Sequence, residues 1–142
     1  MKRTEAREAA FFLTYQRTVR GEPVQELMEI SLEGEALQLN DFARELAALC
    51  DEKTAELDEV IARYLNNWKL SRLPRLTLAA LRLAACELLY RPDVPVAVTI
   101  NEAVELLKKY ASEEDALFAN GVLGAMAKNE PIQKDAGEEK ED

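Results

Sequence analysis

The chain has 142 residues, and its 27 acidic and 18 basic side chains give a formal net charge of −9. This length suits one domain, and a hydrophobic share of 48% is enough for a real core. Because the sequence has no histidine, Ser-His-Asp and Cys-His nucleophiles and histidine metal sites are excluded.

Three helices are predicted in the first third of the chain. Leu and Ala are more than twice as frequent as Val, Ile and Thr, which favours helices throughout. Apolar residues recur with helical spacing from about Thr4 to Val19. Pro23 suits the first turn of a second helix, which reaches Gly34, and Asn40 suits the N-cap of a third.

Two further helices are predicted in the middle of the chain. The fourth is amphipathic, with an apolar side that runs from Leu57 to Trp68. Pro74 starts the fifth, which is apolar on almost every side over residues 76–89. A helix of that kind lies at the centre of a bundle, so we expect Leu81, Leu83 and Ala84 to be buried.

The last two helices follow a proline-containing loop at residues 91–95. Thr99 and Glu102 have the spacing of a capping box, which would open a sixth helix that ends at Tyr110. Ser112 opens a seventh, and the glycines within it predict the close approach of another helix.

The predicted fold class is therefore all-α, with about seven helices in a single domain over residues 1–128. Residues 129–142 form an acidic tail with few apolar side chains, which we expect to be disordered. Cys50 and Cys86 stand alone in apolar patterns and are expected to be small buried side chains. Without a long apolar run or a signal-peptide core, we expect a cytoplasmic protein that has no contact with a membrane.

Positive charge is concentrated in two blocks. Residues 1–20 carry a net charge of +3, and residues 63–91 carry +5, while the rest of the chain is acidic. We expect the first helix and the basic residues at 69–82 to approach each other and form one basic surface that binds anions. The alternative is that both blocks are ordinary solvated faces.

The second half of the chain carries an ordered set of short motifs. They are Leu81-Arg82-Leu83-Ala84, Glu87-Leu88, Asp93-Val94-Pro95, Ile100-Asn101-Glu102-Ala103-Val104-Glu105-Leu106 and Phe118-Ala119-Asn120-Gly121-Val122-Leu123. This set resembles the NusB family of bacterial transcription antitermination factors. The first helix agrees, through Ala6-Arg7-Glu8 and Leu13-Thr14-Tyr15-Gln16.

The resemblance implies two packed helical subdomains, no enzymatic activity and no cofactor. It also implies a heterodimer with a small-subunit ribosomal protein, NusE. That pair would bind boxA-type RNA in nascent transcripts, notably ribosomal RNA, and help RNA polymerase to resist termination. The alternative is a helical protein-interaction module, possibly a homodimer, with weak or lost RNA binding.

RNA contacts are expected at the N-terminus and in the seventh helix. Lys2, Arg3 and Arg7 are the candidate phosphate ligands, because the family uses an arginine-rich N-terminus, although the usual arginine run is absent here. Phe118 is the candidate for stacking on an unpaired base, and its alternative position is the core.

Other motif residues have candidate roles in protein contacts or in structure. Tyr15 and Trp68 are either core residues or anchors for the protein partner. Arg82, within an apolar helix, needs an acidic partner such as Glu102 or Glu105, or a place at the partner interface. Structural roles are expected for Asn101, for Glu102 in the capping box, for Asn120 in a bond to the preceding loop, and for Gly121 in close packing.

Overall fold

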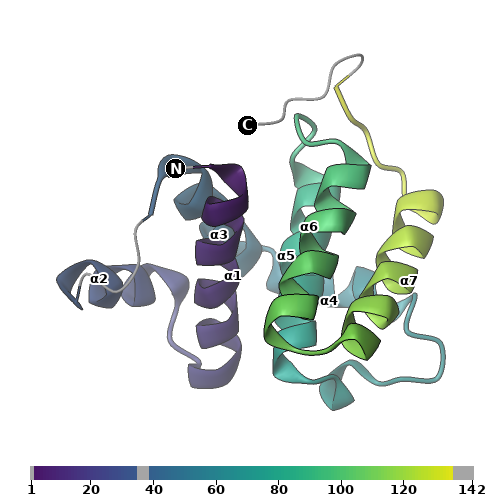
Figure 1. Cartoon of the computed structure of the whole chain (residues 1–142), viewed down its shortest axis with the longest axis horizontal. Coiled ribbons are helices and arrows are strands. Elements are labelled where there is room, and N and C mark those ends of the chain that lie inside the picture. Colours follow the sequence, from purple (N-terminus) through teal and green to yellow (C-terminus); the bar gives the residue numbers. More distant parts are fainter. Residues whose placement is uncertain (1, 35–38, 136–142) are drawn as a thin grey trace.

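The computed structural model describes residues 2–34 and 39–135, and in this part of the chain it contains helices and no strand (Figure 1). This confirms the predicted all-α class. None of the described helices is long and apolar enough to span a membrane. The helices are α1 (Arg3–Arg20), α2 (Val24–Gly34), α3 (Asp41–Glu52), α4 (Thr54–Ala62), α5 (Arg75–Tyr90), α6 (Val96–Tyr110) and α7 (Glu113–Asn129), with a 3₁₀ turn, η1 (Leu70–Arg72), before α5.

The helices form two groups that meet along α5. Figure 1 shows α1, α2 and α3 on one side and α4 to α7 on the other. Helix α5 packs against α1 and α3 in the first group and against α4, α6 and α7 in the second. The arrangement fits the expected two packed helical subdomains.

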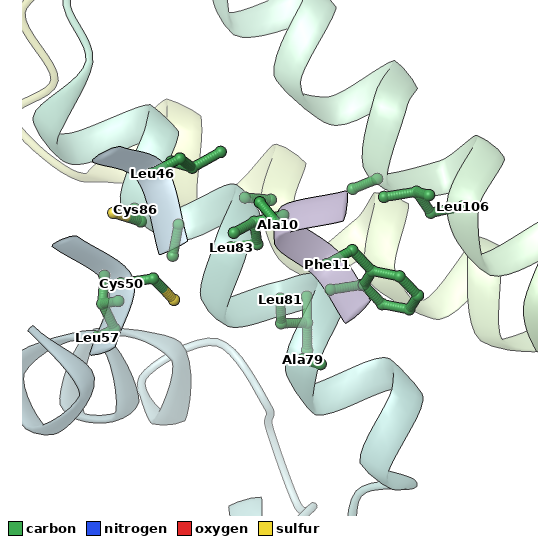
Figure 2. Packing of buried hydrophobic residues seen from close by; sticks show 14 of the residues in the cluster. Ala10, Phe11, Leu46, Cys50, Leu57, Ala79, Leu81, Leu83, Cys86 and Leu106 are labelled. Atoms are coloured by element: carbon green, nitrogen blue, oxygen red, sulfur yellow. The ribbon is translucent and has the colours of Figure 1, made fainter. Parts of the chain in front are cut away.

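The central position of α5 confirms the prediction from its all-round apolar pattern. Leu81, Leu83 and Ala84 are all buried. Figure 2 shows side chains of α5 beside those of α1 and α3, among them Cys86 of α5 and Cys50 of α3. Both cysteines are buried free thiols, as expected, and a hydrogen bond with the Cys50 thiol, together with burial, raises the pKa of the Cys86 thiol.

Local signals set several of the helix ends. The Asn40 side chain accepts a hydrogen bond from the Ala43 backbone N–H at 2.9 Å, and the Ser112 hydroxyl accepts one from Asp115 N–H at 3.0 Å. Both predicted N-caps are therefore confirmed. Helix α1 ends at Gly21, whose φ of 89° lies in the left-handed region that glycine adopts easily.

Two predicted helix boundaries were wrong. Helix α4 ends at Ala62 and does not continue to Trp68, because the chain turns through Asn66, which has a φ of 56°. Helix α6 begins at Val96, directly after Pro95. Thr99 therefore lies inside the helix and cannot cap it; its hydroxyl donates instead to the Glu87 carboxylate at 3.2 Å.

The glycines of α7 do not admit a neighbouring helix, contrary to prediction. Gly121 and Gly124 face outward, and a Cβ atom built on either would have no described neighbour within 4 Å. Close packing inside the subunit therefore does not explain why α7 contains them.

The start of the C-terminal segment packs against the helices. Glu130 accepts hydrogen bonds from the Arg63 guanidinium and the Tyr64 hydroxyl. Lys134 donates to the Glu87 carbonyl at 2.9 Å and to the Arg91 carbonyl at 2.8 Å. Residues 130–135 are thus fixed on the fold, while the part of the expected tail from 136 to 142 lies outside the described residues.

Candidate nucleic-acid interface

Arginine guanidinium groups from both ends of the α1–α5 sequence surround the Phe42 ring at the start of α3, among them the N-terminal Arg3. Lys2 precedes α1 and is exposed. Arg3 is half-buried, bonds Asp93 at 3.5 Å and places its guanidinium carbon 4.5 Å from the centre of the Phe42 ring. Arg91 lies at 4.7 Å from the same ring centre. The Arg91 guanidinium also donates hydrogen bonds to Asp93, and these bonds are the main reason why the pKa of the Asp93 carboxyl is lowered to about 2.

Arg7 has a different environment from the other two N-terminal cations. Its side chain is only 3% exposed, and its Nε donates to both Glu87 oxygens at 3.1 and 3.0 Å. Its Nη1 reaches Glu102 at 3.4 Å. Arg7 thus joins α1 to α5 and α6, and its guanidinium is not accessible to a phosphate.

A second cluster lies where α7 passes the segment between α4 and α5. The rings of Trp68 and Phe118 meet edge to face, with their centres 6.3 Å apart and their planes at 72°. Trp68 is 60% exposed, and Phe118 is partly buried against the core. A surface hollow of about 530 Å³ lies beside the pair, between residues 63–68 and α7, and a smaller one of about 250 Å³ includes Arg72.

Three cations follow Trp68 in the chain, and one of them, Arg72, lines the smaller hollow together with the aromatic pair. Lys69, Arg72 and Arg75 are all exposed, and none of them forms an ion pair with any residue in the described ranges. Acidic side chains also line the smaller hollow, at Glu114 and Asp115. The residues Trp68, Lys69, Arg72, Arg75 and Phe118 are called the aromatic–basic surface below. The charge pattern of the sequence indicated its cations, but the place of Phe118 beside them depends on packing.

The first helix and the block at residues 69–82 approach each other, as expected, since α1 packs against α5, but the N-terminal cations Lys2, Arg3 and Arg7 do not join residues 69–75 in one basic surface. Helices α1 and α5 are antiparallel, since Arg7 contacts Glu87 while Thr18, eleven residues later, bonds Arg82 at 3.1 Å. The start of α1 therefore lies beside the end of α5. The N-terminal cations and the aromatic–basic surface are at opposite ends of this helix pair.

Candidate partner-binding residues have mixed environments. Arg82 donates to the two Asp58 oxygens at 2.7 and 2.8 Å, so its acidic partner is neither Glu102 nor Glu105. Tyr15 is partly buried against the core, and Trp68 is exposed. This leaves Trp68 and part of Tyr15 available to another molecule.

The residues with expected structural roles also differ in their surroundings. Asn101 is exposed on α6, and Glu102 serves the Arg7 ion pair. Asn120 is exposed, and its side chain has no hydrogen bond within the described part of the chain, so the expected bond to the preceding loop is not formed. Gly121 lines the larger hollow.

Comparison with known proteins gives consistent results over nearly the whole chain. The model of the NusB family matches residues 4–128. Transcription antitermination protein NusB of Ruminiclostridium cellulolyticum is 37% identical over 141 residues, which are 98% of this chain and 97% of that protein. The protein of the same name from Clostridium botulinum strain Kyoto is 39% identical over 142 residues, covering 89% of this chain and 99% of the relative.

Solved structures agree with the sequence relatives. A structure of the antitermination factors NusB and NusE in complex with double-stranded RNA matches with a TM-score of 0.81 and 30% identity, covering 90% of this chain and 97% of that one. The structure of T. maritima NusB matches with a TM-score of 0.79 and 34% identity, with coverages of 91% and 92%.

Proposed function

Because the chain belongs to the NusB family of transcription antitermination proteins, we propose that it binds boxA-type RNA in nascent transcripts, notably ribosomal RNA, as a pair with the small-subunit ribosomal protein NusE. The pair would join the antitermination complex of RNA polymerase in the cytoplasm. The related solved complex of NusB, NusE and double-stranded RNA supports this partnership. The family is not enzymatic, so the function is binding alone.

The aromatic–basic surface is the observation that carries the proposal. Single-stranded RNA is bound by aromatic rings that stack on unpaired bases and by cations that contact the phosphates. Trp68 and Phe118 offer the rings, and the cations that follow Trp68, at positions 69, 72 and 75, have no acidic partner among the residues that the structure describes. We assign Phe118 to stacking on an unpaired base. We assign Trp68 to contacts with the same RNA strand and not to contacts with the protein partner.

The N-terminal cations supply a second phosphate contact. Lys2 and Arg3 lie at the molecular surface, whereas Arg7 is held by Glu87 inside it. We therefore keep Lys2 and Arg3 as phosphate ligands and give Arg7 the role of positioning α1. A strand that contacts both groups must cross the face between the two ends of the α1–α5 pair.

The protein partner adds affinity that this acidic chain lacks. We propose that Tyr15 contributes to that interface from the accessible part of its ring. Arg82, which is satisfied by Asp58, would support the interface by holding α4 against α5. NusE would also bring positive charge to the RNA, because a chain of net charge −9 repels RNA everywhere outside its basic groups.

Fluorescence anisotropy tests the proposal. It measures the affinity of the chain, with and without NusE, for a labelled boxA-type RNA and for a scrambled strand. We expect tighter binding of the boxA-type strand by the pair. Phe118→Ala should weaken binding about 5- to 150-fold through lost stacking, with little change in salt dependence. Lys69→Ala with Arg72→Ala should instead flatten the salt dependence, and Lys128→Ala, which removes an exposed cation of α7 outside both groups, should leave binding nearly unchanged.

Equal binding of both strands by the pair would contradict the proposal. The exposed side chains of Trp68 and Leu117 would then be better explained by a protein partner or a second copy of the chain. Sedimentation of the chain alone distinguishes these two explanations.

A further inference from the structure

The larger surface hollow, between residues 63–68 and α7, has the size and lining of a small-molecule site. Its volume is about 530 Å³, and such sites have volumes of about 300–1,000 Å³. Trp68, Leu117 and Phe118 give it an apolar side, and Asn66 and Asn67 line it with amides. This combination suits a ligand that has a flat apolar face and a polar edge, and an unpaired nucleobase has both.

The aromatic side of the hollow leaves surface for another flat ring. Trp68 and Phe118 meet edge to face with their centres 6.3 Å apart, and this geometry does not cover the faces of both rings. Trp68 is 60% exposed, and Leu117, which lines the same hollow, is 73% exposed. Large apolar side chains that are exposed together mark a contact with another molecule.

Gly121 leaves the α7 side of the hollow open. It lines the hollow, and a Cβ atom built on it would have no described neighbour within 4 Å. A glycine inside a helix is less favourable than alanine, and packing within the described chain does not account for it. Because it has no side chain, the backbone at this position allows a flat group to approach closely.

Two amide side chains supply the polar part of the hollow. Asn66 and Asn67 are exposed, and neither side chain forms a hydrogen bond within the part of the chain that the structure describes. The Arg63 guanidinium and the Tyr64 hydroxyl, on the same wall, already donate to Glu130. The two amides therefore remain available to a ligand. Each offers a donor and an acceptor, the combination that reads the edge of a base.

The charge beside the hollow favours a nucleic acid as its occupant. Residues 68–75 contain the cations Lys69, Arg72 and Arg75 and no acidic residue, in a chain whose net charge is −9. A base bound in the hollow has phosphates on both sides of it along the strand, and these cations follow Trp68 directly. An uncharged ligand or an apolar peptide would gain nothing from this local positive charge.

We propose that the hollow is a base-selective pocket for one unpaired base of the bound RNA. The base stacks on the Trp68–Phe118 side, approaches α7 at Gly121, and is read by the amides of Asn66 and Asn67. The inference rests on the proposed function, which assigns an RNA strand to the aromatic–basic surface but no group that distinguishes one base from another. Aromatic rings bind every base, because each base has a π-face, so selection falls to the amides.

The room at Gly121 is tested with a matched pair of variants, Gly121→Ala and Gly124→Ala, in the presence of NusE. Both replace a glycine of α7 that has open space above it, but only Gly121 lines this hollow. Both variants should raise the Tm through helix propensity. Gly121→Ala alone should weaken the binding of boxA-type RNA about tenfold, because its methyl group takes space from the base. Equal affinities of the two variants would overturn the proposal.

The role of the amides is tested with strands in which each base in turn is replaced by the other three. Asn66→Gly with Asn67→Ala removes both amides, and glycine suits the φ of 56° at position 66. We expect this variant to lose a preference of about 5- to 150-fold at one position of the strand. The control Asn101→Ala, which removes an exposed amide of α6, should keep it. A preference retained at every position by the double variant would contradict base reading by these amides.

Trp68 also reports directly on the hollow, because it is the only tryptophan in the chain. Boxa-type RNA added to the chain alone should quench its fluorescence, and an abasic residue at the selected position should abolish the quenching. Preferential binding of boxA-type RNA without quenching would overturn the pocket and leave the proposed function intact. Quenching with equal affinity by a scrambled strand, which contains the same bases in another order, would contradict the proposed function and leave the pocket intact.

Discussion

Arg7 shows how a residue that resembles a ligand contact can belong to the core. Its guanidinium and the Glu87 carboxylate are 3% and 2% exposed, so both charges have lost most of their hydration. Such a loss is compensated only by close, well-directed hydrogen bonds, which Glu102 and Thr99 complete. The pair joins residues 80 positions apart, which is why a local pattern at the N-terminus could not reveal that Arg7 is buried.

We therefore expect Arg7→Met to destabilise the fold by about 3–5 kcal/mol, because Glu87 would remain buried without a counter-charge. Replacing the pair together, Arg7→Met with Glu87→Leu, should cost far less, since no lone charge remains. Urea unfolding followed by circular dichroism measures both. A double variant as unstable as the single one would show that the ion pair itself, and not the unpaired carboxylate, determines the loss.

At the scale of elements, the sequence predicted the features that depend only on residues close together along the chain. The number of helices, the central α5 and the caps at Asn40 and Ser112 follow from periodicity, prolines and short polar side chains. The early end of α4 was missed because its apolar pattern continues through the Asn66 turn. Thr99 was misassigned because its hydroxyl bonds a carboxylate of another helix.

Helix α7 offers a test of its outward-facing glycines. A Cβ at Gly124 meets open space, so Gly124→Ala should stabilise the chain by about 1 kcal/mol through helix propensity, and raise the Tm by about 3–5 °C. The same change at Gly21, where φ is 89°, should destabilise by about 1 kcal/mol, because alanine is strained there. Thermal melts compare the two, and a loss of stability in Gly124→Ala would reveal a packing role that the structure does not show.

At the scale of the whole molecule, the antiparallel pairing of α1 and α5 determines the layout of the candidate site. Charge counting located both basic blocks, but only the fold reveals that the N-terminal cations and residues 69–75 lie at opposite ends of the pair, while Arg91 of the second block joins Arg3 at the Phe42 ring. The position of Phe118 beside Trp68 likewise depends on how α7 packs against the segment after α4. Sequence reasoning therefore identified most of the candidate residues but not their grouping.

This separation predicts that the two cation groups act independently in RNA binding. Lys2→Ala with Arg3→Ala should lower the salt slope for single-stranded RNA by about 1.4, and Lys69→Ala with Arg72→Ala should lower it by a similar amount. Since the groups share no neighbour, their losses of binding free energy should add in the quadruple variant to within about 0.5 kcal/mol. Anisotropy titrations at four or more salt concentrations measure both quantities. A quadruple variant that binds no more weakly than the weaker of the two doubles would mean that RNA uses only one end of the molecule, and the end that matters would be the one whose double variant alone lowers the slope.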